Sequence, residues 1–502
     1  MVVTDRSGGH RHGLKKEDFV LLEDGKEQKI ASFEEIEKPG LAAVVPRKPN
    51  QFTNTEVEGR AQSPLTIIVL DQVNTSATEQ LVARQQIVKY LSEPRGQPAP
   101  TSLFAITRDG VRVLHDFSTD LSAVAASLGK ARSENQLVEK ASQEALSADP
   151  MLFAMMQHEI KTEQRMESIE RRAAILITLR SLQQIARSCE GLSGRKALLW
   201  ATSGFPFSIN PLSKVMNIAG VKGDSVEDVH DLYQKTWRLL NHAGVALYPV
   251  DVRQLATTTV PDMNIQDPNK DFHDDATWMQ DETIGTFRTF AGETGGLALF
   301  NTNDLQAAFQ AAYDDNASYY LLSYYLIRKH KAPGWHNLGV KVHASGIQVR
   351  ARSGFFLQRE GSAETTDPEM QMALNSPLDY SAIPITGEWK EVTKAKEHGK
   401  KKVVFQLTMP ANFAMIDNNS SNHMLLEIVA VARSATGETA GEFSKTMDGH
   451  LQADSVMQIR NHGMDYRGAL TLPPGDYTVR FAVLDRLSGR LGSVAAPLRV
   501  EH

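Results

Sequence analysis

The chain has 502 residues, 41% hydrophobic and 23% charged, and these proportions are typical of folded soluble domains. A chain of this length is too long to fold around one hydrophobic core of ordinary size, so we predict two to four domains. The formal net charge of −6 and the lack of a basic stripe in the sequence exclude nucleic-acid binding as the main function. A single cysteine, Cys189, excludes an internal disulfide and a cysteine-based zinc site. We expect it to be buried and structural.

Residues 1–45 predict a small β unit. Strand-like runs are separated by turns, and Asp24-Gly25 is a good hairpin signal. The residues that follow are rich in Pro, Asn, Gln, Ser and Thr, and they predict a linker over 46–63.

Residues 64–356 predict an α/β domain, because strand and helix patterns alternate along them. Two nearly continuous apolar runs, at 65–70 and 197–201, suit strands that are buried on both faces of a parallel sheet. Ser76 is a fair N-cap for a helix that continues to about Leu91. A hairpin at 102–114 supplies one antiparallel edge.

Further patterns complete this domain. The Ala-, Glu-, Gln- and Met-rich residues 131–164 predict a helical insertion. Gly292 to Gly296 predict a helix C-cap and turn. Other helices are predicted at 120–128, 169–185, 225–243, 281–291 and 304–316, and other strands at 246–250, 297–300, 318–326, 338–342 and 347–351. This alternation predicts a doubly wound, mostly parallel sheet with helices on both faces.

The pattern of residues changes in the last part of the chain. Residues 357–380 are polar and predict a linker. Strand signals then recur over 381–502, and no helical stripe interrupts them in the sequence. These residues predict a β-sandwich of the immunoglobulin-like class without its disulfide. The predicted fold class is therefore α/β, with a small N-terminal β unit and a C-terminal β-sandwich.

Strand 64–71, the helix after it, and strand 197–202 together resemble a von Willebrand factor type A domain. Residues 1–356 resemble, more specifically, the von Willebrand A-related proteins of the Acidobacteria type. The resemblance rests on pieces that share their order and spacing, which include Glu17-Asp18-Phe19, Leu70-Asp71 with Asn74-Thr75, Asp116 to Asp120, Gly194 to Leu198, Tyr248 to Asp251, Tyr319 to Tyr324 and Arg352 to Phe356. It implies a von Willebrand A-like fold, in which a metal site lies at the C-terminal edge of the sheet.

The resemblance implies that this metal site is degenerate. Asp71 matches the Asp of the family's Asp-x-Ser-x-Ser motif, and Thr75 matches its second Ser. Val73 stands where the first Ser belongs, and Ser203 stands where a later strand carries Asp. Hard cations take several oxygen ligands, usually with one or two carboxylates. We therefore expect a degenerate site at Asp71, Thr75 and Ser203, with no certain cofactor and with Mg²⁺ or another divalent cation as the candidate.

A structural role for the same residues stays open. Asp71 would then accept backbone N–H groups at the N-terminus of the next helix, and Asn74 and Thr75 would bond within the loop. In both cases, the crevice at the carboxyl ends of the strands is the expected ligand face of an open α/β sheet. The loop residues Gln72, Asn74 and Ser76 are expected to lie on that face.

Other candidate motifs are weaker. His10 and His12 could share a metal, but no third ligand is visible in the sequence, so we expect a flexible turn. The acidic stretch 262–282 lacks a calcium-loop pattern and predicts a solvated loop. The tyrosines at 319, 320, 324 and 325 predict sheet packing. No nucleophile elbow, phosphate loop or zinc-protease helix occurs in the sequence, so we predict no catalytic residues.

These observations favour a non-enzymatic, extracytoplasmic module for protein interaction, adhesion or scaffolding. Its partner is expected to be a protein or a glycan. The alternatives are a structural component of envelope assembly and a metal-dependent hydrolase. No run of 18 apolar residues occurs, so no transmembrane segment is expected. The first residues are strand-like and not a signal peptide, so we expect either that the natural N-terminus was trimmed away or that an upstream start was missed. We expect a secreted, periplasmic or cell-surface protein.

Overall fold

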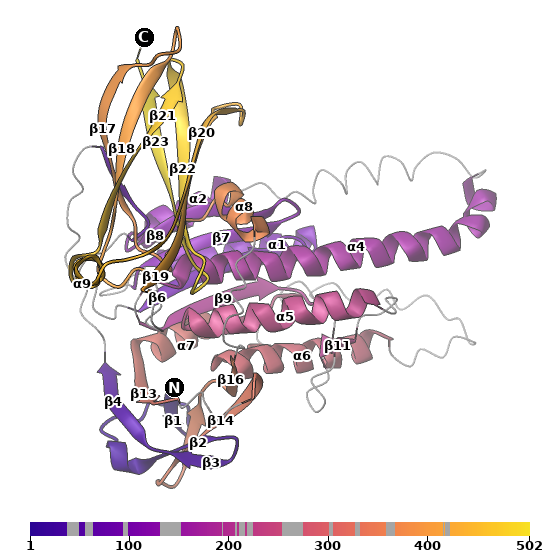
Figure 1. The fold of residues 1–502 in the computed structure, drawn as a ribbon. Helices are drawn as coiled ribbons and strands as arrows, with labels where there is room; N and C mark the ends of the chain where they lie inside the picture. Colours follow the sequence, from indigo (N-terminus) through magenta and orange to yellow (C-terminus); the bar gives the residue numbers. More distant parts are fainter. Residues whose placement is uncertain are drawn as a thin grey trace. The chain divides into compact units, whose positions relative to one another are not determined.

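The computed structural model describes residues 1–37, 50–55, 64–93, 99–130, 152–192, 194–205, 208–209, 216–217, 224–253, 275–300, 305–326, 332–357, 367–414, 416 and 422–501. The chain forms two compact units. Unit 1 comprises Met1–Gly40, Gln62–Gln183 and Gly194–Leu357, and unit 2 comprises Leu41–Ala61, Gln184–Ser193 and Gln358–His502. Helices and a mixed sheet dominate unit 1, and antiparallel sheets dominate unit 2 (Figure 1).

A five-stranded mixed sheet forms the centre of unit 1, in the order β12-β9-β6-β7-β8. The strands are β6 (Leu65–Asp71), β7 (Thr101–Thr107), β8 (Gly110–Ser118), β9 (Lys196–Thr202) and β12 (Val245–Asp251). The first four strands in the sheet order run parallel, and β8 pairs antiparallel with β7. All four parallel strands are buried along their whole length, which confirms what the continuous apolar runs predicted for β6 and β9.

Helices cover both faces of this sheet. Helices α1 (Ala77–Ser92), α2 (Leu121–Lys130) and α7 (Leu305–Ala317) pack on the face that carries Ile68 and Leu70. On the other face, the Trp200 ring lies near Phe287 and Phe290 of α6 (Asp275–Thr294), and Phe290 also contacts α5 (Asp224–His242). Helix α4 (Leu152–Cys189) bonds to α5 through Gln183 Nε2 and Thr236 Oγ1, 3.0 Å apart.

The N-terminal strands of unit 1 pair with strands that lie about 300 residues later. Strand β1 (Val2–Asp5) pairs with β15 (Ile347–Arg350), and β4 (Ile30–Glu37) pairs with β13 (Ser318–Tyr324). Strands β16 (Gly354–Leu357), β14 (Gly334–Val342), β2 (Phe19–Glu23) and β3 (Lys26–Gln28) form one sheet, and the short 3-10 helix η1 (Lys16–Asp18) precedes β2. Residues 1–37 therefore share their sheets with residues 318–357, which the sequence analysis did not predict. An isolated hairpin such as β2–β3 is at best marginally stable, so it needs strands from elsewhere in the chain as partners.

Four predicted strands of the α/β domain lie outside the five-stranded sheet in the structure. The runs at 338–342 and 347–351 fall on β14 and β15, which pair with β2 and β1. The run at 318–326 pairs with β4 and not with the five-stranded sheet. The run at 297–300 contributes only a bridge from Leu299 to Val250. The tyrosine prediction holds for Tyr319 and Tyr320, which are buried, whereas Tyr325 is 85% exposed. The short strands β10 (Ser208–Ile209) and β11 (Met216–Asn217) pair with each other.

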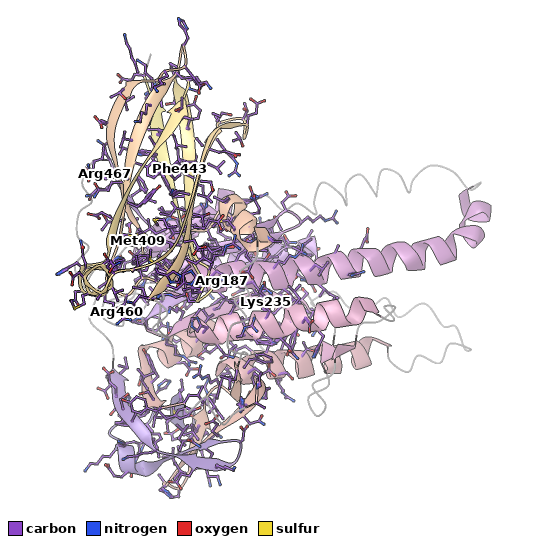
Figure 2. The ribbon with its side chains drawn as sticks, viewed as in Figure 1. Arg187, Lys235, Met409, Phe443, Arg460 and Arg467 are labelled. Carbon is purple, nitrogen blue, oxygen red and sulfur yellow. The ribbon has the colours of Figure 1, made fainter. Side chains whose placement is uncertain are left out.

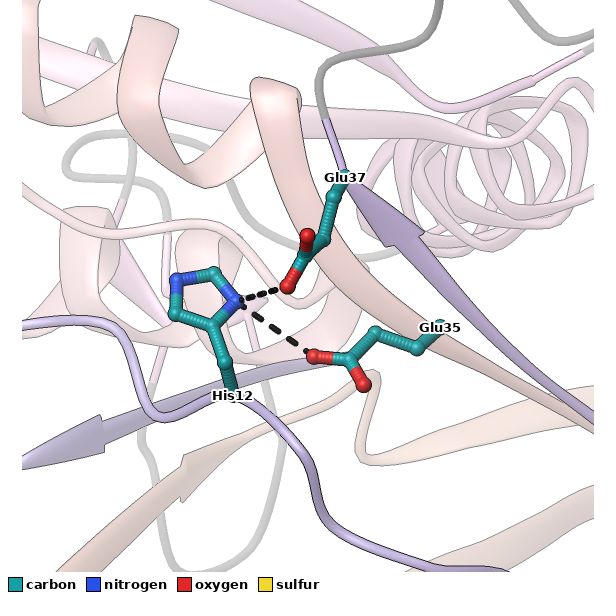
Figure 3. A group of neighbouring side chains, drawn as sticks. All are labelled: His12, Glu35 and Glu37. Carbon is teal, nitrogen blue, oxygen red and sulfur yellow. Dashed lines mark ion pairs between the residues drawn. The ribbon is translucent and has the colours of Figure 1, made fainter.

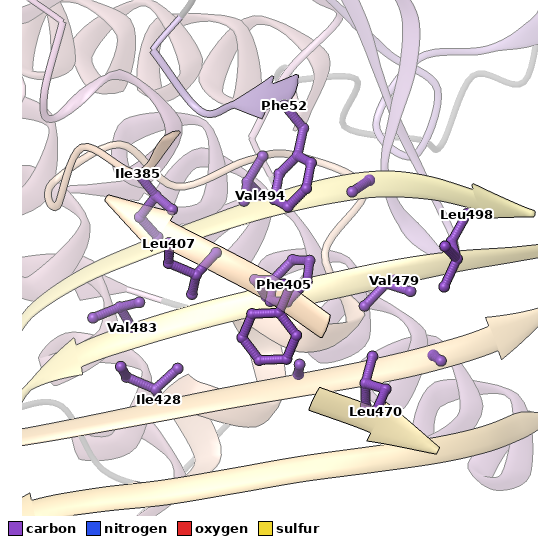
Figure 4. Close-up of a cluster of buried hydrophobic side chains, with 14 of the residues drawn as sticks. Phe52, Ile385, Phe405, Leu407, Ile428, Leu470, Val479, Val483, Val494 and Leu498 are labelled. Carbon is purple, nitrogen blue, oxygen red and sulfur yellow. The ribbon is translucent and has the colours of Figure 1, made fainter. Parts of the chain in front are cut away.

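Unit 2 is sandwich-like. One antiparallel sheet has the order β21-β18-β17-β5, with β21 (Met464–Leu472), β18 (Lys401–Met409), β17 (Thr386–Lys394) and β5 (Gln51–Thr53). The other has the order β20-β19-β22-β23, with β20 (Thr439–His450), β19 (His423–Ser434), β22 (Gly475–Asp485) and β23 (Arg490–Val500). Both sheets contribute to one buried apolar cluster, including Phe405, Ile428 and Val483 (Figure 4). Met409 belongs to it and Phe443 packs against it (Figure 2).

Unit 2 differs from the predicted organisation in three places. Strand β5 lies inside the predicted linker 46–63, and α8 (Asp367–Asn375) lies inside the predicted linker 357–380. The expectation that no helix interrupts residues 381–502 is wrong, because α9 (Ala453–His462) lies between β20 and β21. This helix buries only Val456, so its apolar stripe is too short to be recognised in the sequence.

Some predicted features are confirmed, and others lie outside the described residues. Cys189 is buried and carries a free thiol, as expected. Residues 131–151 of the predicted insertion and 262–274 of the predicted acidic loop are outside the described residues, and α4 begins at Leu152. The loop prediction is wrong for residues 275–282, because they belong to α6. Among the helices that the structure describes, none combines the length and the apolar character needed to cross a membrane.

Candidate functional site

Asp71 is the last residue of β6, and its buried carboxylate is the centre of the candidate site. Its Oδ1 accepts hydrogen bonds from the backbone N–H groups of Val73 (3.1 Å) and Asn74 (3.0 Å). Its Oδ2 accepts hydrogen bonds from Asn74 Nδ2 (2.8 Å), Trp200 Nε1 (3.2 Å) and Thr202 Oγ1 (3.0 Å). Two loop amides and three side chains thus converge on one carboxylate.

This carboxylate has little capacity left for a cation. A carboxylate offers about four lone-pair sites, and five donors already point at Asp71. Burial raises the pKa of Asp71, and hydrogen bonds from Asn74, Thr202 and Val73 oppose that rise. Donors of this kind stabilise the ionised form, although the single proton of the Thr202 hydroxyl is shared with the Gly204 carbonyl oxygen at 2.9 Å. The donor set therefore does not match what Mg²⁺ or Ca²⁺ requires, which is several oxygens with free lone pairs.

Thr75, Ser76 and Ser203 belong to a second network beside the first. Ser76 is the N-cap of α1 and forms a capping box with Glu79. The Ser203 hydroxyl donates to Glu79 Oε2 at 2.7 Å, and the Ser203 backbone N–H donates to Thr75 Oγ1 at 3.2 Å. The structure thus brings all three residues to one edge of the sheet. Ser76 and Ser203 contact Glu79 there, and Thr75 contacts Ser203.

Gln72, the last predicted residue of this edge, is buried. Its carbonyl oxygen and that of Thr75 accept hydrogen bonds from Gln80 Nε2, at 3.3 and 2.8 Å. The side chain of Gln80 therefore fixes the loop from inside the protein. Of the loop residues, Ser76 is exposed, and Val73 and Asn74 are partly exposed.

A second buried carboxylate lies at the same edge. Asp251 ends β12, which pairs with β9, and its side chain is 1% exposed. The Arg253 guanidinium donates to it, with Nη2 2.6 Å from Oδ2 and Nε 3.0 Å from Oδ1. Charge-assisted contacts of this kind neutralise the carboxylate within the protein.

Several functional neighbours were missed by the sequence analysis. Thr178 of α4 accepts a hydrogen bond from Asn74 Nδ2 at 2.9 Å, although 104 residues separate them. Trp200 and Thr202 lie on β9, which pairs parallel with β6. The register of this pairing brings both side chains to Asp71, and the sequence alone does not give that register. Glu79 had a detectable signal, because Ser76-x-x-Glu79 is a capping-box pattern.

Comparisons with known proteins assign no family. No family model matches the sequence, and no curated protein matches it. Among solved structures, the chain is similar to a glycosyl hydrolase family 2 member from Bacteroides cellulosilyticus DSM 14838, with 10% identity over 23% of this chain and 14% of that chain, and a TM-score of 0.16. It is also similar to Northeast Structural Genomics Consortium target SoR45, with 15% identity over 24% of this chain and 85% of that chain, and a TM-score of 0.15. TM-scores this low carry no argument about fold or function.

Proposed function

We propose that the chain is a non-enzymatic, extracytoplasmic protein-binding module whose α/β part is von Willebrand A-like and binds its partner without a metal ion. The strand order β12-β9-β6-β7-β8, with four parallel strands and an antiparallel edge, supports the doubly wound assignment. The observation that carries the proposal is the saturation of the Asp71 carboxylate by five donors of the chain itself.

The proposed contact surface is the exposed part of the carboxyl edge around the start of α1. It is defined here by Ser76, Thr78, Leu81 and Ser203, and is called the edge surface. Ser76 and Thr78 are exposed, and Leu81 is 51% exposed although it is apolar. Hydroxyl groups around an exposed leucine can combine hydrogen bonds with apolar burial, a combination that suits a protein partner. Unit 2 would act as a spacer.

Capture of partners from the source organism's envelope fraction tests this proposal. The full chain is immobilised and compared with Thr78→Arg, which places a long charged side chain on the edge surface. We expect wild-type protein to retain its partner equally in EDTA and in Mg²⁺, and Thr78→Arg to retain about tenfold less, which corresponds to roughly 1.4 kcal/mol of binding free energy.

Thr439→Arg is the matched control, because Thr439 is an exposed threonine of β20 in unit 2. It should retain the partner like wild-type protein. Loss of the partner in EDTA, or full retention by Thr78→Arg, would contradict the proposal. Recovery of only further copies of this chain would favour a structural role in envelope assembly.

A further inference from the structure

A histidine and two glutamates meet on the small β region of unit 1, far in sequence from the edge surface. His12 lies in the glycine-rich loop after β1, and Glu35 and Glu37 lie two residues apart on β4. Residues two apart on a strand point to the same face. His12 Nδ1 lies 3.3 Å from Glu35 Oε1 and 2.8 Å from Glu37 Oε1 (Figure 3). The sequence showed no third ligand for this histidine, because the two glutamates come from β4, a separate strand later in the chain.

The spacing of these three atoms suits a small divalent cation. Zinc binds imidazole nitrogen and carboxylate oxygen at about 2.0–2.2 Å, so two tetrahedral ligands lie about 3.3–3.5 Å apart. The His12–Glu35 separation already has this value, and the three ligand atoms lie within 4.8 Å of one another. Glu37 needs to move outward by about half an ångström. Its side chain is 56% exposed, so a small rotation is unhindered.

Glu35 is held in place by neighbours that are not ligands. Tyr320, its cross-strand partner on β13, donates its hydroxyl to Glu35 Oε1 at 2.9 Å. The backbone N–H of Gly13 donates to both Glu35 oxygens at 3.1 and 3.2 Å. Hydrogen bonds of this kind orient the carboxylates that bind metals.

A similar group elsewhere in unit 1 lacks this capacity. Glu23, Asp24 and His336 also lie close together. However, His336 Nδ1 contacts Asp24 Oδ2 at 2.7 Å, and its Nε2 contacts the Ala332 carbonyl oxygen at 2.9 Å. Both ring nitrogens face acceptors, so both carry protons, and the hydrogen bond to Asp24 raises the pKa of His336. No lone pair is left on the His336 ring for a cation.

His12 differs in this respect. Within the part of the chain that the structure describes, its Nε2 has no hydrogen-bond partner, so this nitrogen can carry the ring proton while Nδ1 presents a lone pair. Two carboxylates and a neutral imidazole then supply two negative charges for a divalent cation. The cation takes the position of the proton that Nδ1 otherwise shares with the glutamates.

We propose that His12 Nδ1, Glu35 Oε1 and Glu37 Oε1 form a binding site for Zn²⁺ or a similar divalent transition-metal ion. Three protein ligands leave a fourth position for water or for a donor from another molecule. The ion ties the loop that carries His12 to strand β4. This site is independent of the edge surface and of the proposed function.

Zinc titration of the full chain, without a polyhistidine tag, tests the proposal. Isothermal titration calorimetry at neutral pH should give one tight equivalent of Zn²⁺. His12→Ala and Glu37→Gln should each weaken that equivalent by about tenfold or more, because each removes a ligand. A Co²⁺ titration followed by visible absorption gives a second readout, since the d–d bands report a low-coordinate site with N and O ligands.

His423→Ala is the matched control. His423 Nε2 pairs with a single carboxylate, Asp448 Oδ1, at 2.8 Å on the surface of unit 2, so its loss should leave the tight equivalent unchanged. All three side chains are at least partly exposed, and unchanged thermal melts would show that the variants fold. The proposal is overturned if wild-type protein binds no tight equivalent, or if His12→Ala and Glu37→Gln bind zinc like wild-type protein.

Discussion

Asp71→Ala should destabilise unit 1 by about 3–5 kcal/mol, measured by urea unfolding without any added metal. The substitution removes a buried acceptor and leaves the Trp200 indole N–H facing a cavity, whereas the Thr202 hydroxyl keeps the Gly204 carbonyl oxygen as an acceptor. It also releases the loop amides of Val73 and Asn74. An unmade hydrogen bond at a buried donor costs about 1–3 kcal/mol, and several such donors act together here.

Asp120→Ala provides the comparison for this substitution. Asp120 also accepts backbone N–H groups, from Ser122 and Ala123 at the start of α2, but it is exposed. Its loss should cost only about 1 kcal/mol, the usual value for an N-cap. A metal-ligand role for Asp71 leads to the opposite expectation. Removing such a carboxylate from metal-free protein would cost little, so equal effects of the two substitutions would contradict the structural role.

Gly296→Ala should destabilise unit 1 by about 3 kcal/mol or more. Gly295 has a φ of 74°, and the Gly296 N–H donates to the Ala291 carbonyl oxygen at 2.8 Å, which ends α6 in the turn that the sequence predicted. A Cβ at Gly296 would lie 1.9 Å from the carbonyl oxygen of Leu247 in β12. The obstacle is backbone of a buried strand, so the strand itself would have to shift.

Gly292→Ala is the control for this position. Gly292 lies in the last turns of the same helix, and a Cβ there meets nothing within 4 Å. Alanine has the higher helix propensity, so this variant should be stabilised by about 0.5–1 kcal/mol. The two substitutions should therefore change the midpoint of thermal unfolding in opposite directions. Equal midpoints would mean that the close approach of Gly296 to β12 is absent in solution.

Patterns within a short stretch of sequence predicted the local structure well. The continuous apolar runs identified β6 and β9, and Ser76 and Gly292 to Gly296 identified helix ends. These features depend on residues within one or two turns or along one strand. Local chemistry alone therefore fixes them.

Pairing between distant segments could not be predicted in the same way. The partners of β1 and β4 lie about 300 residues away. The sequences of β1 and β4 do not indicate which strands they pair with. For the same reason, the sequence did not predict that Thr178 contacts Asn74 or that two carboxylates lie beside His12. The resemblance to a metal-dependent adhesion site placed Asp71, Thr75 and Ser203 at one edge. Only the hydrogen bonds revealed that Asp71 is already saturated.

We propose that the edge around Asp71 binds its partner without a metal ion. Calorimetric melting of the full chain in EDTA, in Mg²⁺ and in Ca²⁺ tests it most directly, with Ser203→Ala as the site control. A cation at about 100 times its dissociation constant would add roughly 2.7 kcal/mol to the unit that binds it, a shift of several degrees. The account predicts the same melting temperature in all three conditions. A rise of several degrees with either cation, abolished by Ser203→Ala, would contradict it.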